Sequence, residues 1–113
     1  MLFRSRGHKT GFFCDQRENR RAVADLASGR DLLDLCTYTG GFAVAAAKAG
    51  ARRVVGVDMD EEALETARQN VRLNRVMVDF FHQDLFNYLK QSREKFDVVV
   101  IDPPKMADRK SVV

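Results

Sequence analysis

FDVVVIDPPK, residues 96–105, is the stretch of sequence that decides the fold. An apolar run rich in β-branched residues and closed by two prolines is typical of a buried parallel strand that leaves into an extended loop. The loop Asp102-Pro103-Pro104-Lys105 therefore follows the carboxyl end of its strand, where open α/β sheets bind their ligands. It supplies a carboxylate, a rigid turn and a cation, so we expect it to face a ligand.

Strands and helices alternate upstream of this run. After an entry loop with a short strand at 11–13, a helix that Asp15 caps is expected to run to Ala27. The remaining expected strands are 31–36, 53–58 and 77–81, and the expected helices are 41–49, one capped by Asp60, and 85–91. This alternation predicts one α/β domain with a doubly wound parallel sheet.

Composition sets the class of protein. The 113 residues are 45% hydrophobic and 31% charged, which fits one globular domain. Lys48 interrupts the best apolar stretch, well short of the roughly 20 residues of a membrane span. Residues 1–6 have no apolar core and do not resemble a signal peptide. We therefore expect a cytoplasmic protein with no membrane partner.

Cysteines and charge narrow the functional classes further. Cys14 and Cys36 make neither a disulfide framework nor a metal site, so no metal is expected. The net charge of +3 is mildly basic, with cations crowded into the first thirty residues and again after the proline turn. That distribution fits a nucleic-acid partner and an ordinary solvated surface about equally well.

The stretch 37–41, Thr-Tyr-Thr-Gly-Gly, lets the backbone approach a ligand closely where a strand runs into a helix. It lacks the G-x-G-x-x-G spacing that seats a pyrophosphate, which counts against a dinucleotide. It also lacks the Gly-Lys-Ser/Thr ending of a P-loop. The structural alternative is a simple tight turn.

Two acids follow the next two strands. Asp58, which ends the second strand, can accept hydrogen bonds from both hydroxyls of a ribose. Asp84, after the third strand, can receive the exocyclic amine of an adenine. The alternative role for each is helix capping, although Asp60 already fills that role beside Asp58. A glycine turn and two acids at one sheet edge together indicate a nucleoside-type cofactor.

Five segments carry a resemblance to a known family: 7–17 (GHKTGFFCDQR), 38–44 (YTGGFAV), Asp58, 67–71 (ARQNV) and 102–105 (DPPK). With them the chain resembles the class I S-adenosylmethionine-dependent methyltransferases, which have a Rossmann-like fold. More narrowly, it resembles the bacterial 23S rRNA (cytosine-5) methyltransferases, which join an RNA-binding PUA domain to the catalytic domain. The resemblance implies S-adenosylmethionine as cofactor and RNA, specifically ribosomal RNA, as partner.

The resemblance also implies roles for single residues. Asp58 would hold the ribose and Asp84 the adenine of the cofactor. Enzymes that act on bases extract them from the stack, and residues 102–105 would face such a flipped base. The residues implied at the methionine part are Tyr38, Thr39, Gly40 and Gly41, with Gln16 and Arg17 closing over its carboxylate.

The sequence departs from the family in one respect. Cytosine-5 methylation needs a cysteine thiolate that adds to carbon 6 of the base. The family carries it after the next strand, and neither Cys14 nor Cys36 occupies that position. Residues 1–113 are thus expected to be a fragment, the cofactor-binding half of the domain with about four of seven core strands. We expect it to lack the RNA-binding domain, to leave strand 98–101 with an unpaired edge, to be marginally folded or self-associating, and not to transfer methyl groups.

Two alternatives stay open. An adenine or guanine N-methyltransferase also uses an Asp-Pro-Pro loop, typically followed by an aromatic residue where this chain has Lys105. A cofactor-binding module without catalysis is the other alternative.

Overall fold

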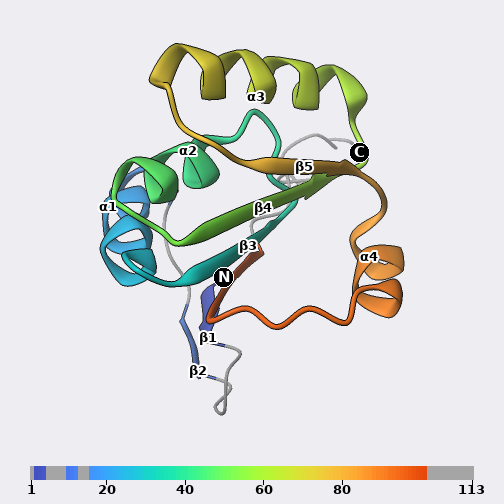
Figure 1. The fold of residues 1–113 in the computed structure, drawn as a ribbon. Coiled ribbons are helices and arrows are strands. Elements are labelled where there is room, and N and C mark those ends of the chain that lie inside the picture. The colour runs from blue at the N-terminus through green and yellow to red at the C-terminus, as the bar shows by residue number, and fades with distance from the viewer. Residues whose placement is uncertain (1, 5–9, 13–15, 102–113) are drawn as a thin grey trace, which may run out of the picture.

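A mixed sheet with the strand order β2-β1-β6-β3-β4-β5 forms the centre of the computed structural model, which describes residues 2–4, 10–12 and 16–101 (Figure 1). The strands are β1 (Leu2–Arg4), β2 (Thr10–Phe12), β3 (Asp31–Leu35), β4 (Arg53–Asp58), β5 (Asp79–His82) and β6 (Val98–Ile101). The helices are α1 (Gln16–Ala27), α2 (Gly41–Lys48), α3 (Glu61–Asn74) and α4 (Leu85–Gln91).

Strands β6, β3, β4 and β5 run parallel, as predicted. The bounds of β4 and α4 agree with the sequence-based expectation residue for residue, and α3 begins after Asp60, whose carboxylate accepts from the N–H of Ala63 at 3.2 Å. Strand β5 starts two residues later than predicted, because Met77 is 89% exposed and β4 is the one described strand that pairs with this edge strand.

The sheet buries both of its faces, which explains why β3, β4 and β6 read as nearly continuous apolar runs. On one face Leu32, Val54 and Val98 pack with the buried sides of α1 and α2. On the other face Leu33 and Val55 pack with residues of α4 and of the segment after it, Tyr88 and Phe96. Of the four described helices, Figure 1 shows α4 on one side of the sheet and α1, α2 and α3 on the other. Among the described helices, none is long and apolar enough to cross a membrane.

The expectation of an unpaired edge on β6 is wrong. Strand β1 pairs antiparallel with β6, in the register Leu2 with Val100 and Arg4 with Val98, and β2 then pairs antiparallel with β1. Sequence reading placed only an entry loop at β1, and a short strand one residue beyond β2. The hydrogen-bonding groups of β6 therefore have a neighbour on each side, which removes the edge argument for self-association.

Candidate cofactor site

The turn from β3 to α2 has an unusual backbone. Cys36, Tyr38 and Gly40 all have positive φ, at 66°, 55° and 87°. The left-handed region costs little at Gly40 but is strained for the other two. The N–H of Gly40 donates to the carbonyl of Thr37 at 2.8 Å, which closes a tight turn immediately before the first turn of α2. The predicted glycine turn is therefore present, and its shape is more specialised than a simple strand-to-helix connection.

Asp58 ties this turn to the next loop. Its Oδ2 accepts from the N–H of Tyr38 at 2.8 Å, and its Oδ1 accepts from the N–H of Asp60 at 2.9 Å. Each carboxylate oxygen has more than one lone pair, so both keep capacity for a hydroxyl group. Asp58 thus does not cap α3, and the capping alternative belongs to Asp60 alone.

Buried groups beneath the turn fix its position. Thr37 donates from Oγ1 to Oδ2 of Asp34 at 2.8 Å, and both residues are buried. A Cβ atom placed on Gly56 would lie 2.9 Å from the ring of Phe80 and 3.0 Å from Oγ1 of Thr37. Only glycine at this point of β4 lets the turn and β5 approach each other so closely.

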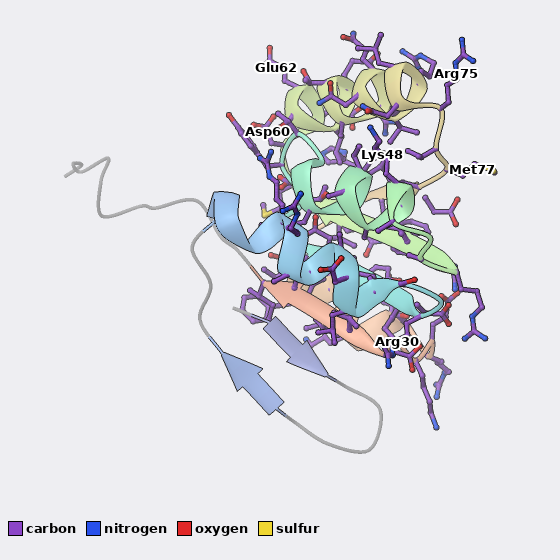
Figure 2. All side chains as sticks on the ribbon, turned by 90° about the vertical axis from the view of Figure 1, so that its left-hand side faces the viewer. Arg30, Lys48, Asp60, Glu62, Arg75 and Met77 are labelled. Atoms are coloured by element: carbon purple, nitrogen blue, oxygen red, sulfur yellow. The ribbon has the colours of Figure 1, made fainter. Side chains whose placement is uncertain are left out.

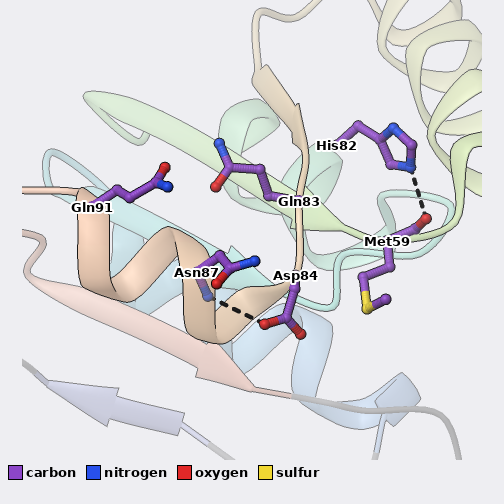
Figure 3. Close-up of a pocket in the computed structure, with 6 residues that line it drawn as sticks. All are labelled: Met59, His82, Gln83, Asp84, Asn87 and Gln91. Atoms are coloured by element: carbon purple, nitrogen blue, oxygen red, sulfur yellow. Dashed lines mark hydrogen bonds between the residues drawn. The ribbon is translucent and has the colours of Figure 1, made fainter.

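An open pocket of about 410 Å³ lies beside Asp84. Asp84 caps α4, because its Oδ2 accepts from the N–H of Asn87 at 3.2 Å. Figure 3 shows the lining side chains coming from the end of β4, the end of β5 and α4. The residues that line the pocket are Met59, His82, Gln83, Asp84, Asn87 and Gln91. Capping leaves the second carboxylate oxygen of Asp84 for a ligand, so the two roles considered for this residue are compatible.

Sequence reading found Asp84 but missed the other lining residues. Asn87 and Gln91 follow Asp84 at helical spacings of three and seven, which places all three on one face of α4 and was a detectable signal. His82 had no such signal. Its Nε2 lies 2.8 Å from the carbonyl oxygen of Met59, a contact between the end of β5 and the residue after β4 that depends on the pairing of these two strands.

One further cation lies at the glycine turn. A Cβ atom on Gly41 would lie 2.5 Å from Nη2 of Arg20, so the guanidinium of Arg20 rests against this glycine. Gln16 and Arg17 belong to the first turn of the same helix, α1, but their side chains are outside the described residues. The predicted base-facing loop, 102–105, is outside them too.

Charge is distributed unevenly between the two edges of the parallel strands. Figure 2 shows Asp60 and Glu62 at one end of α3, and Arg75 at the other end. At the amino edge, the hydrogen bond to Asp31 raises the pKa of the Arg52 guanidinium.

Within the described ranges no cluster of His, Cys, Asp and Glu side chains is suited to a metal ion. The carboxyl edge thus offers a glycine turn, a carboxylate and an amide-lined pocket, a set that fits a nucleoside joined to an amino acid.

Comparisons with known proteins agree with this geometry. The model of a family described as S-adenosylmethionine-dependent methyltransferase matches residues 1–113. A curated relative from Aeromonas salmonicida, named ribosomal RNA large subunit methyltransferase I, is 48% identical over 111 residues, covering 93% of this chain and 28% of the relative. The chain thus spans well under a third of that relative's length.

Solved structures give the same result. A SAM-dependent methyltransferase from Streptococcus mutans superimposes with a TM-score of 0.74 and 32% identity, over 84% of this chain and 27% of that one. A tRNA (uracil-54, C5)-methyltransferase from Pyrococcus abyssi, solved with S-adenosyl-L-homocysteine, superimposes with a TM-score of 0.65 and 33% identity, over 87% of this chain and 25% of that one. The Rossmann-like methyltransferase fold expected from the sequence is confirmed.

Proposed function

Because this chain belongs to the family of S-adenosylmethionine-dependent methyltransferases, we propose that the protein methylates carbon 5 of a cytosine in large-subunit ribosomal RNA, in the cytoplasm. Residues 1–113 would be the cofactor-binding half of its catalytic domain. The observation that carries the cofactor part is the meeting of the glycine turn, Asp58 and the Asp84 pocket at one edge of the sheet. The RNA part is supported by the name of the Aeromonas relative.

Each part of the site has a separate task in this proposal. Asp58 accepts hydrogen bonds from the two ribose hydroxyls, with its carboxylate already oriented by the N–H groups of Tyr38 and Asp60. Asp84 accepts from the adenine amine, and the pocket beside it receives the ring. The turn at 38–41 holds the methionine part. The guanidinium of Arg20, which rests against Gly41, adds a cation near the carboxylate of this part. Gln16 and Arg17 close over the same carboxylate.

The cofactor supplies a methyl group bound to a positively charged sulfur, which a nucleophilic carbon can attack. Residues 102–105 would hold the flipped base against it, with Asp102 and Lys105 as polar contacts and the prolines as a rigid wall. The presence of Lys105 rather than an aromatic residue favours cytosine-5 chemistry over N-methylation of adenine or guanine.

Two measurements test the proposal. Calorimetry should show that S-adenosylhomocysteine binds more tightly than a nicotinamide dinucleotide, and the opposite order would overturn the cofactor assignment.

The protein that contains this chain is then incubated with S-adenosylmethionine and an unmodified large-subunit rRNA transcript, and the digested nucleosides are analysed by mass spectrometry. We expect 5-methylcytidine. An N-methylated purine would replace the cytosine-5 assignment with the alternative, and no methylated nucleoside despite cofactor binding would reject the RNA substrate.

A further inference from the structure

Helix α3 touches the glycine turn at two points, and neither contact was part of the site described above. Asn70 donates from Nδ2 to the carbonyl oxygen of Thr39 at 2.9 Å, and this bond is partly buried. One helical turn earlier, the Cβ of Ala67 lies 3.2 Å from the position that a Cβ on Gly40 would occupy. The turn therefore rests directly on the face of α3 that carries Ala67 and Asn70.

The bond from Asn70 fixes one particular peptide group. The peptide that joins Thr39 to Gly40 is planar, so its carbonyl and its N–H turn together. The N–H of Gly40 is held by the carbonyl of Thr37 at 2.8 Å, and the opposite end of the same peptide is held by Asn70. Rotation of this peptide would break both bonds.

This restraint matters because the turn is strained. Non-glycine residues with positive φ, here Cys36 and Tyr38, are strained and persist only when their surroundings fix them. Asp58 holds the first half of the turn through the N–H of Tyr38. Among the described residues, Asn70 is the side chain that holds the second half, at the point where α2 begins.

We propose that Asn70 is a positioning residue for the amino-acid part of the cofactor. It holds the Thr39–Gly40 peptide in the orientation that shapes the surface for that part, without contacting the cofactor itself. This inference rests on the proposed cofactor site, and it deepens that site by adding a residue from a helix that contributes no ligand to it.

Asn74 offers a matched control on the same helix. It lies one turn further along α3, donates from Nδ2 to the carbonyl of Asn70 at 2.8 Å, and accepts from Nζ of Lys48 at 3.2 Å. Among the described residues its side chain thus makes two hydrogen bonds, against one for that of Asn70, and neither of the two reaches the turn. Asn74→Ala reports the cost of removing an α3 amide that does not touch the site.

The experiment compares two ligands. S-adenosylhomocysteine carries the amino-acid part, whereas adenosine engages only the ribose and adenine positions. By calorimetry, Asn70→Ala should weaken S-adenosylhomocysteine roughly 3- to 10-fold, the loss of one hydrogen bond, and leave adenosine within about 2-fold. The isosteric Asn70→Asp, which sets a carboxylate against the carbonyl of Thr39, should weaken the first ligand further. Asn74→Ala should change neither affinity.

Each contrary result has a definite meaning. Equal losses for both ligands, or an unchanged affinity for S-adenosylhomocysteine in both Asn70 variants, would overturn the positioning role. If one Asn70 variant does not melt cooperatively, the other provides the measurement. Failure of the wild-type protein to bind S-adenosylhomocysteine would instead reject the proposed cofactor site.

Discussion

The two edges of the parallel sheet are held together in different ways. At the carboxyl edge, the acids Asp58, Asp60 and Asp84 accept hydrogen bonds from backbone N–H groups. At the amino edge, side chains pair with side chains, as where Arg52 donates from Nε and Nη2 to the two oxygens of Asp31, both at 2.8 Å. Both edges are rich in charge, but they use it to different degrees to fix the main chain. At the amino edge the N–H of Asp31 donates to Oδ2 of Asp97 at 3.0 Å, and exposed ion pairs lie beside this bond.

This difference indicates which edge needs precise geometry. A carboxylate bound to backbone N–H groups fixes the path of a loop, whereas an exposed ion pair adds little stability because water screens it. The Arg52 side chain is 61% exposed. We therefore expect substitutions at the carboxyl edge to change ligand binding and local order, and substitutions of the exposed ion-pair cations at the amino edge to change little.

The largest effect is expected for Asp58→Ala. It removes the two acceptors proposed for the ribose, so the affinity for S-adenosylhomocysteine should fall by about 1.5–3 kcal/mol, roughly 10- to 150-fold. Calorimetry measures the loss, with Asp60→Ala as the control because Asp60 only caps α3. An unchanged affinity in Asp58→Ala would leave Asp58 with a structural role alone.

Gly56→Ala tests how tightly the carboxyl edge is packed. The new methyl group would lie 2.9 Å from the ring of Phe80, and we expect the free energy of unfolding to fall by about 1–3 kcal/mol. Chemical denaturation measures the change. Adding Phe80→Leu should recover part of it, and strictly additive losses in the double variant would argue against a direct clash.

Asp84 variants separate capping from ligand binding. Asp84→Ala should lose the cap of α4, worth about 0.5–2 kcal/mol of stability, together with part of the ligand affinity. Asp84→Ser keeps a capping oxygen but has no carboxylate, so its melting temperature should stay close to that of the wild type while S-adenosylhomocysteine binds more weakly. Wild-type affinity in the serine variant would show that Asp84 serves only α4.

The smallest effect is expected at the amino edge. Arg52→Gln removes a bidentate ion pair in which the Asp31 side chain is 14% exposed and that of Arg52 61%, so the melting temperature should fall only slightly. The affinity for S-adenosylhomocysteine should stay unchanged. Thermal melts and calorimetry under the same buffer conditions give the comparison. A drop in affinity close to that of Asp58→Ala would mean that the two edges are not independent.

Local patterns in the sequence predicted most of the parallel sheet and its helices. The β-branched run of β4 and the helical spacing of α4 each contain the information that sets their bounds, so both were predicted correctly. Strand β5 has an exposed Met77 before it and one neighbour only, and its start was placed two residues early.

Features that depend on distant segments were not predicted. The double acceptor role of Asp58 requires the N–H of Tyr38, twenty residues earlier in the chain. The positive φ of Cys36 could not be predicted from its residue type, because a positive φ is common for glycine and rare for cysteine. The roles given to residues 102–105 stay predictions.

The pairing of β1 with β6 also affects the order in which the strands fold. It joins Leu2 to Val100, residues almost a hundred positions apart, so it is among the contacts of highest sequence separation in the sheet. Closing so long a loop carries an entropic cost that must be met before the pairing stabilises anything, and such contacts slow folding. During synthesis β1 emerges before β6, and the two strands can pair only after β6 has left the ribosome. We therefore expect β1 to dock late, after the local β3–α2–β4 unit has formed, and its amides to exchange faster with solvent than those of β4.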